Sequence, residues 1–567
     1  MNTRMYISWQ GLFIVLSLAG STLLASPPAQ AQPATDEERA DLEQLRATTL
    51  ALIQALVEQG LISRERADAL VRQATQRRAP AVAAVAVPPA GAASAPPVVR
   101  VPYLPETLKA QIKEDIRNDV MVTAREEGWA DSRKIPPWLR GISLEGDIRV
   151  RAQGDLFDDH NLPADVYRSQ TSSPAWSPDL LNTQNSRERL TLRARLAVNA
   201  KVSDDVSASL RLATGSTSGS PTSESQTLGS HFNRLSVGLD RAWLRWEPRY
   251  DWRFEGGRLQ NPFFGTDLAW PDDLSVDGVA MRHDLDVANG VLVFATVGAF
   301  ALEEFATTRS DKWLYGVQAG TDWALSGRTQ LRLGLGYYNF RNVEGIRENG
   351  PPPTGPLAGT VPYQTSQYPA GVRQRGNTLI NLNDPTSTAA PVWGLASRFK
   401  PINLTAALTL GHFEPVQVGL VFDYLSNAGG FDAADIRQRA GTDAVNGLAK
   451  ETTATQWRLQ VGSAKLAERG DWQGFFAVRK LERDAWVDAF TDTTWNLGGT
   501  GYKGFSLGGA YTLDRNTSVG LRWTSTRTED DGVRFLQVPG DPSSLSGNLS
   551  SAPLKIDVIQ LEVNAKF

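Results

Sequence analysis

The 567-residue sequence contains no cysteine, which excludes disulfide bonds, zinc–thiolate sites and cysteine nucleophiles together. Histidine is also scarce, and its four copies show no spacing that suits a metal pair: His160, His231, His283 and His412. The formal net charge of −4 is small for this length, so the chain as a whole has no attraction to nucleic acid. Any binding preference must therefore come from where charges are placed locally.

Long hydrophobic runs are scarce too. Only 41% of the residues are hydrophobic, which excludes a bundle of transmembrane helices. An apolar run does occur near the N-terminus, from Gly11 to Ala25, and it is followed by the small-x-small pattern of residues 29–31. This run is shorter than the roughly 20 residues that a spanning helix needs. The sequence therefore predicts a secretory signal peptide over residues 1–31.

The region after the signal has helical periodicity. Leu42, Leu45, Thr49, Leu52 and Leu56 recur at spacings of three and four, which indicates an amphipathic or coiled-coil helix. We expect a helical segment over residues 32–78, an Ala/Pro-rich linker over 79–103, and an amphipathic helix with a Pro-rich lead-in over 104–140. The stripe fits either an oligomerising helix or a solvated one.

From residue 141 onward the apolar period changes from 3.6 to 2, which is typical of β-strands with one apolar and one polar face. The final residues, VIQLEVNAKF, show this pattern clearly, since alternate positions from Ile559 to Phe567 are apolar. Two strands begin at Ile142 and Arg187. Fourteen more are predicted near 205–215, 234–248, 251–260, 274–284, 290–302, 312–324, 329–340, 398–412, 416–426, 453–466, 471–484, 501–513, 516–528 and 554–567.

The connections between these strands alternate between short turns and long polar loops. An even strand number with this asymmetry is the expected layout of a bacterial outer-membrane barrel, whose periplasmic turns are short. The sheet must also close, because an open edge in lipid would leave backbone groups unpaired. The sequence therefore predicts an all-β transmembrane protein: a closed antiparallel up-and-down β-barrel of about 16 strands over residues 141–567, with the last strand beside the first.

Several stretches resemble one known family. They are LVEQGLISRERADAL (56–70), RARLAVNAKVSDDVSASLRLATG (193–215), LGSHFNRLSVGLDRAWLRW (228–246), GGRLQNPFFGTDLAWPDDL (256–274) and NLTAAL (403–408). In their order and spacing the chain resembles the Putative porin family of Gram-negative outer membranes. The resemblance implies a passive diffusion channel, a periplasmic N-terminal extension, a homotrimer, and a terminal Phe567 read by the barrel assembly machinery. It does not identify the solute.

Strand parity directs many arginines toward the lumen. Nine of them, from the first five strands, form a predicted basic wall: Arg149, Arg151, Arg189, Arg193, Arg195, Arg211, Arg241, Arg245 and Arg253. Arg332, Arg458 and Arg522 extend it more sparsely. Guanidinium groups bind carboxylate or phosphate in a fork, so such a wall favours anions. The predicted inward acids leave open that the arginines only pair with them; these acids are Glu145, Asp147, Glu188, Glu255 and Asp277.

The third long loop, residues 261–273, carries Asp267, Asp272 and Asp273 among aromatic residues. In 16-stranded porins the loop at this position typically folds into the barrel. We therefore expect a constriction in which acids on the loop face arginines on the wall, and an ordinary external loop is the alternative.

Two glycine patterns match enzyme motifs but stand in the wrong context. Residues 504–508 match G-x-S-x-G around Ser506, yet they lie within an alternating strand instead of at a strand-to-helix turn. Residues 499–504 match G-x-G-x-x-G, but no helix follows. We expect no enzymatic activity and no cofactor, and an outer-membrane Ser-His lipase is the competing enzyme hypothesis.

A structural role is the second alternative. The helical segments before residue 141 would then tether the envelope, with peptidoglycan as a partner. For the channel, the expected partners are outer-membrane lipid, the barrel assembly machinery and small hydrophilic solutes or ions, and nucleic acid is not expected.

Overall fold

The computed structural model describes residues 141–567, except residue 162 and the ranges 165–180, 217–218, 307–308, 348–354, 358–364, 384–391, 442–444, 446–447, 530–533, 536–546 and 549–553. The predicted signal peptide, helical segments and linker all precede residue 141 and so lie outside the described residues. Among the described residues, no helix is both long and apolar enough to cross a membrane.

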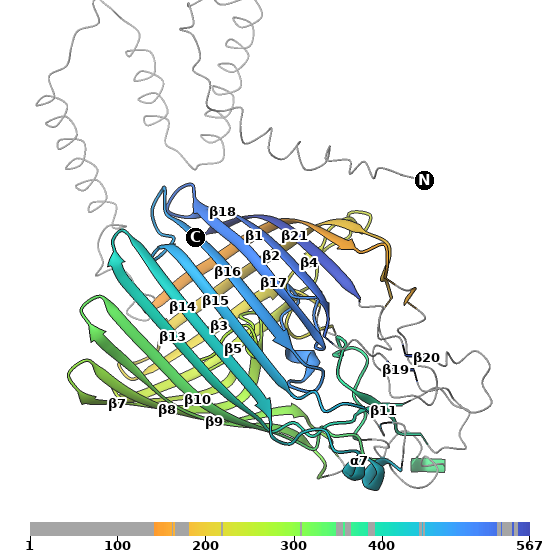
Figure 1. Ribbon diagram of the computed structural model, residues 1–567. Coiled ribbons are helices and arrows are strands. Elements are labelled where there is room, and N and C mark those ends of the chain that lie inside the picture. Colours follow the sequence, from red (N-terminus) through yellow and green to blue (C-terminus); the bar gives the residue numbers. More distant parts are fainter. Residues whose placement is uncertain are drawn as a thin grey trace, which may run out of the picture. The chain divides into compact units, whose positions relative to one another are not determined.

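Sixteen antiparallel strands of the described region close into a barrel, as the alternation predicted (Figure 1). The strands are β1 (Ile142–Phe157), β2 (Arg187–Lys201), β3 (Val206–Thr214), β5 (Val237–Arg249), β6 (Trp252–Gln260), β7 (Ser275–Ala288), β8 (Val291–Glu303), β9 (Lys312–Ser326), β10 (Thr329–Arg341), β13 (Pro401–Phe413), β14 (Val416–Asn427), β15 (Thr453–Ser463), β16 (Trp472–Leu481), β17 (Tyr502–Thr512), β18 (Thr517–Thr528) and β21 (Lys555–Lys566). Each strand pairs with its neighbours in this order, and β1 closes the sheet by pairing with both β2 and β21.

The two ends of the barrel differ in the length of their connections. Two-residue turns join β5 to β6, β7 to β8, β9 to β10 and β13 to β14. The opposite end carries long connections, the longest over residues 342–400. These contain the small elements β4 (Gln226–Thr227), η1 (Gly355–Leu357), β11 (Leu379–Asn381), β12 (Trp393–Leu395), α7 (Ala433–Ala440), η2 (Asp488–Phe490), β19 (Arg534–Phe535) and β20 (Gly547–Asn548). In Figure 1 the β7 turn lies at the left and α7 at the lower right.

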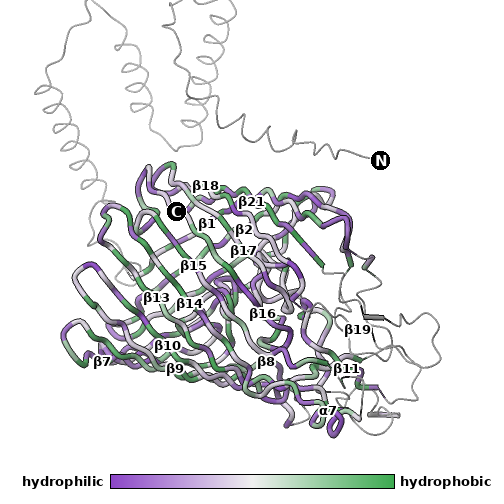
Figure 2. The backbone as a smooth tube through the Cα atoms, in the orientation of Figure 1, coloured by the Kyte–Doolittle hydropathy of each residue, from purple (hydrophilic) through white to green (hydrophobic). Residues whose placement is uncertain are grey.

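The outer face of the barrel is apolar. Large hydrophobic side chains are more than 40% exposed on strands all around it, and examples are Leu144, Leu244, Leu335 and Trp457. Hydrophobic and hydrophilic residues alternate along the strands (Figure 2). Because soluble monomers rarely expose so much contiguous apolar surface, this face is suited to lipid.

The closing strand ends on a specific contact. Phe567 and Gly146 exchange two backbone hydrogen bonds, with N–O distances of 2.9 and 3.0 Å. The Phe567 ring lies over Gly146, where a Cβ atom would clash with it. The predicted alternation also holds at this strand, since Gln560 is buried inside and Val563 is exposed outside. The ring of Phe567 therefore occupies the space left by the missing side chain of Gly146 on β1.

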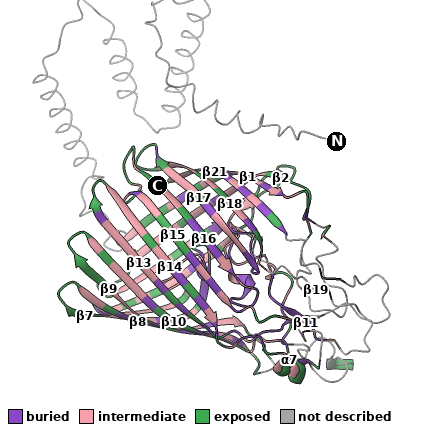
Figure 3. Ribbon diagram, viewed as in Figure 1, coloured by how far each residue is buried: buried purple, intermediate pink, exposed green. Residues whose placement is uncertain are grey.

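Apolar side chains from the long connections pack inside the barrel. The rings of Trp270, Tyr338, Phe340 and Trp486 meet edge to face, with centroids 5.1–5.7 Å apart. Such aromatic pairs each contribute about 0.5–1.5 kcal/mol beyond area burial. The buried segments lie within the barrel toward its long-loop end (Figure 3). This core fills part of the lumen.

Two acids that we predicted to face inward lie on the outer side. Glu188 pairs across the sheet with Gly154, next to the inward pair of Arg189 and Gln153. Asp277 pairs with Arg258, and its neighbour two residues on, Val279, is exposed on the outer face. The prediction was wrong because adjacent residues of a strand face opposite sides, so Glu188 cannot share a face with Arg189.

Candidate functional site: the lumen cavity

The loop of residues 261–274 folds into the barrel and is held there by hydrogen bonds to the opposite wall. The Thr266 hydroxyl donates to Asp423 Oδ2 on β14 at 2.6 Å. The Phe264 backbone N–H donates to Gln318 Oε1 on β9 at 2.8 Å. Trp270 is 5% exposed within the aromatic core. The loop therefore has a defined position across the lumen.

Asp267 also attaches the loop to the barrel, through one ion pair and two hydrogen bonds. Its carboxylate lies 2.8 Å from the Arg479 guanidinium of β16 and accepts a hydrogen bond from the Gln456 amide of β15. It also accepts one from Trp495 Nε1 at 3.2 Å. Burial acts to raise the pKa of Asp267, but Arg479 and Gln456 outweigh it and hold that pKa well below its usual range. The carboxylate is therefore charged at any physiological pH.

A second loop, residues 482–501, lies against the first, and its inward fold was not predicted from the sequence. Trp486 is fully buried, and Trp495 binds Asp267. The Asn377 amide donates to the backbone oxygens of Arg483 and Trp486 at 2.6 and 2.8 Å, which ties in a third loop. Two tryptophans within a polar connection were the available signal, since such residues rarely stay exposed without a partner.

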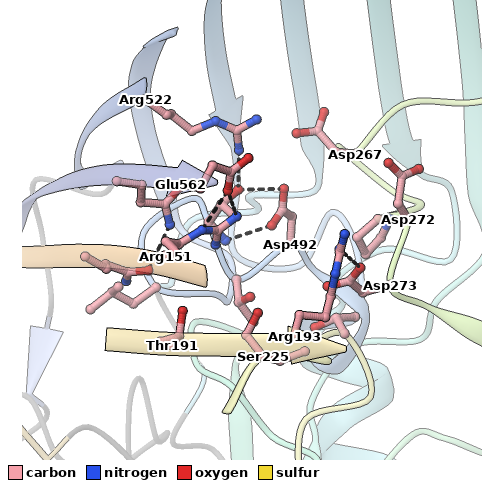
Figure 4. Close-up of a pocket in the computed structure, with 18 of the residues that line it drawn as sticks. Arg151, Thr191, Arg193, Ser225, Asp267, Asp272, Asp273, Asp492, Arg522 and Glu562 are labelled. Atoms are coloured by element: carbon pink, nitrogen blue, oxygen red, sulfur yellow. Dashed lines mark hydrogen bonds and ion pairs between the residues drawn. The ribbon is translucent and has the colours of Figure 1, made fainter. Parts of the chain in front are cut away.

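A polar cavity of about 750 Å³ remains between these loops and the wall made by β1, β2, β15, β18 and β21. In Figure 4, Arg151, Glu562 and Arg522 lie on one side, and Asp267, Asp272 and Asp273 lie on the other. The cavity is lined on the wall side by Arg149, Arg151, Arg187, Arg189, Arg193, Arg458, Arg522 and Glu562, among others. Loop acids thus face wall arginines across the cavity.

The structure places the nine predicted arginines in two groups. Arg149, Arg151, Arg189 and Arg193 line the large cavity. A second cavity of about 400 Å³ is lined by Arg211, Arg241, Arg245 and Arg253. Arg195 lies among the same strands and binds Asp147.

All nine of these arginines lie within 4.0 Å of an acid. Arg193 lies 3.1 Å from Asp147 and 3.2 Å from Asp273, and Arg195 shares Asp147 at 2.5 Å. The other ion pairs are Arg151–Glu562, Arg189–Asp155, Arg211–Asp240, Arg241–Asp240, Arg245–Glu255 and Arg253–Glu247, and a longer contact of 3.9 Å joins Arg149 to Glu562. The wall therefore carries much less net charge than its arginine count implies.

Two wall arginines differ in this respect. Arg458 of β15 and Arg522 of β18 line the cavity, and neither has a carboxylate oxygen within 4.0 Å among the described residues. On the loop, Asp272 is likewise without an ion pair to any described residue. Its backbone oxygen accepts from Arg241, and its carboxylate faces the cavity.

Glu224 is a buried acid that was not predicted from the sequence. It lies in the connection between β3 and β5, and its carboxylate binds Arg195 and Arg211 at 3.3 and 2.8 Å. Burial is the main cause that raises the pKa of Glu224 to about 7, and the charges of Asp273 and Asp240 act in the same direction. It is therefore a loop group whose charge changes near neutral pH.

The serine of the G-x-S-x-G pattern lies within a barrel strand. Ser506 lies buried on β17, where its hydroxyl is 2.8 Å from that of Thr524 on β18. The described residues contain no cluster of three or more His, Asp or Glu side chains that could hold a metal ion.

Comparisons with known proteins give one family match. The model of the family described as Putative porin matches residues 46–567. Among solved structures, Pseudomonas putida OprB at high pH is 12% identical with a TM-score of 0.40, over 77% of this chain and 97% of that one. The anion-selective porin from Comamonas acidovorans is 12% identical with a TM-score of 0.37, over 75% and 99%. A mutant of Rh. blastica porin is 12% identical with a TM-score of 0.34, over 75% and 100%. No curated protein matches the sequence.

Proposed function

Because the chain belongs to the Putative porin family, we propose that its outer-membrane barrel passes small hydrophilic solutes by passive diffusion through a water-filled, arginine-lined pore that prefers anions. The observation that carries this proposal is the polar cavity between the inserted loops and the β1, β2, β15, β18 and β21 wall. A 16-stranded barrel is wide enough for an aqueous channel, whereas side chains can fill one of eight strands.

The inserted loop is the proposed constriction. Asp272 and Asp273 approach the wall from the loop side, and Arg193 meets Asp273 from the wall side. Opposite charges on the two sides create a field across the passage, which orients polar solutes and disfavours apolar ones. The anchoring of Asp267 to Arg479 supports this role, because a constriction must hold its position against the diffusing solute.

The proposed anion preference rests on unpaired charge. Arg458 and Arg522 supply positive charge and have no carboxylate oxygen within 4.0 Å among the described residues. Of the loop carboxylates of Asp267, Asp272 and Asp273, that of Asp272 is the one without an ion pair to a described residue. We expect a preference of a few-fold only, because most of the lumen is neutralised by ion pairs.

The experiment is a planar-bilayer recording of the purified protein in a KCl gradient. A reversal potential shifted toward the equilibrium potential of chloride supports the anion preference. One shifted toward the equilibrium potential of potassium contradicts it. The absence of any conductance would contradict the diffusion channel itself.

Assembly is proposed to depend on Phe567 and on partners outside the barrel. The contact of Phe567 with Gly146 supports a role in closing the sheet, in addition to recognition by the barrel assembly machinery. The homotrimer, peptidoglycan binding and the periplasmic location of the N-terminal extension stay predictions. Deleting residues 32–100 and measuring conductance and peptidoglycan binding separately distinguishes transport from tethering.

A further inference from the structure

We propose that Arg458, Arg522 and Phe475 form a binding station for small divalent oxyanions on the pore wall. The name anion station is used below for these three residues. The inference rests on the proposed diffusion channel and adds to it a saturable site, which free diffusion through a wide pore does not require.

The first observation is an aromatic platform shared by two guanidinium groups. The Cζ atoms of Arg458 and Arg522 lie 4.3 and 5.1 Å from the centroid of the Phe475 ring. A cation over an aromatic face is stabilised by the quadrupole of the ring. Phe475 can therefore hold two like charges close together on the wall without a carboxylate between them.

The backbone of β17 makes room for this platform. Gly508 lies between Phe475 and Arg522 in the sheet, since it pairs with both. A Cβ atom at Gly508 would lie 2.7 Å from the Phe475 ring, closer than packed carbon atoms approach. The glycine thus allows the ring to lie along the wall toward Arg522, which fixes the spacing of the two guanidinium groups.

The second observation is that the donors of these arginines are largely free. Arg522 donates to the Thr494 hydroxyl at 3.1 Å, and Arg458 makes no side-chain hydrogen bond to any described residue. A guanidinium group carries five N–H donors, and its planar fork matches the two oxygens of a carboxylate or phosphate. Both groups line the large cavity, so their donors can reach a passing solute.

The third observation is a small recess at the station. A pocket of about 160 Å³ lies beside the large cavity and shares Arg458, Arg522, Gln560 and Glu562 with it. Gln460 and Gln473 complete its polar lining. The amides can bind hydroxyl or carbonyl groups of the solute, whereas Glu562 repels excess negative charge. The recess therefore suits a compact anion over a long polyanion.

The two adjacent guanidinium groups match a divalent oxyanion better than chloride. A dianion can accept a forked pair of hydrogen bonds from each arginine, whereas chloride accepts single bonds without directional preference. Phosphate and short dicarboxylates share this chemistry. Binding must stay weak for the solute to leave again, and Glu562 limits the local positive charge accordingly.

The test measures chloride current through the full-length protein in planar bilayers while succinate or inorganic phosphate is added to one side. In the wild type we expect a saturable reduction of the current by at least one of the two anions, which also identifies the chemical class. In the double variant Arg458→Gln/Arg522→Gln, the half-effect concentration should rise about tenfold or more, the loss expected for charge-assisted hydrogen bonds.

The control is Arg253→Gln, which removes one positive charge from the lumen at a half-exposed pair with Glu247. Its half-effect concentration should change by less than about twofold. A second variant, Arg458→Lys/Arg522→Lys, keeps the charge but loses the fork, so the half-effect concentration should rise while the reversal potential in KCl stays near that of the wild type.

The outcomes separate this inference from the proposed function. Conductance in KCl without saturation by either anion overturns the anion station and leaves the channel intact. An equal shift per removed charge in the Arg253→Gln and Arg458→Gln/Arg522→Gln variants also overturns it, because it indicates a response to total charge. If the wild type conducts no current, the proposed function fails and the inference fails with it.

Discussion

The lumen has two basic walls that look alike in sequence and differ in charge. The wall of β1 to β6 carries the nine predicted arginines, and all nine lie within 4.0 Å of an acid, with the longest contacts at Arg241 (3.8 Å) and Arg149 (3.9 Å). The wall of β15 to β18 has fewer arginines, but Arg458 and Arg522 have no such partner among the described residues. Attraction of anions therefore depends on the pairing of arginines more than on their number.

Reversing the charges of the second wall should have the largest effect. The double variant Arg458→Glu/Arg522→Glu replaces the two unpaired cations with anions in the cavity that also holds Asp272 and Asp492. We expect the reversal potential in a KCl gradient to change sign, giving a cation-preferring pore. If the variant still prefers chloride, the paired wall supplies the preference and the contrast between the walls is wrong.

Breaking the ion pairs of the first wall should cost stability and expose charge. Asp147→Asn removes the carboxylate that binds both Arg193 and Arg195. We expect the free energy of unfolding to fall by about 1–3 kcal/mol, the cost of losing hydrogen bonds to charged groups, and the chloride preference to rise. Denaturant unfolding in detergent measures the first effect. The control Asp204→Asn lies at an exposed pair with Lys201 and should change stability by less than about 1 kcal/mol.

The loop between the two walls should respond differently at its two acids. Asp267→Asn removes the carboxylate that anchors the loop to buried Arg479, so we expect a change in single-channel conductance. Asp272→Asn removes a carboxylate without an ion pair to any described residue, so it should shift ion selectivity and leave conductance close to that of the wild type. If the double variant Asp267→Asn/Asp272→Asn matches the wild type in both conductance and ion selectivity, the loop is not the constriction.

The smallest predicted effect is a pH dependence of the first wall. Glu224 has a pKa of about 7, above the ordinary value of 4.5, mainly because it is buried. Its negative charge is lost as the pH falls through 7, which leaves Arg195 and Arg211 less neutralised, so chloride preference should rise on acidification. The same shift favours the protonated folded state, so the contribution of this group to stability decreases as pH rises through 7.

The matched variant for this prediction is Glu224→Gln, whose selectivity should change little between pH 8 and pH 6. Reversal potentials at the two pH values test the difference. An equal pH response in the wild type and the variant would assign the titration to another group.

The fold could be predicted because apolar and polar residues alternate along each strand, which distinguishes its two faces. Sixteen segments with period 2 and the alternation of turn lengths gave the barrel, and the last strand pairs with the first as expected. The errors at Glu188 and Asp277 came from assigning single residues to the lumen without regard to the parity of their neighbours. The ion-pair partners were harder to predict. Glu224 reaches Arg195 and Arg211 from a connection that has no period 2 to place it.

By itself the sequence determined the strand number, the closed sheet and the face on which most lumen arginines lie, because side-chain alternation is a local property of an extended chain. Only the tertiary structure decided which arginines are paired with acids. Asp267 is distant in sequence from Arg479 and Trp495, and Arg458 and Arg522 meet at Phe475 only because β15 to β18 are adjacent in the sheet. Pairing of charges depends on distances of a few ångströms between such remote segments, and no local pattern encodes them.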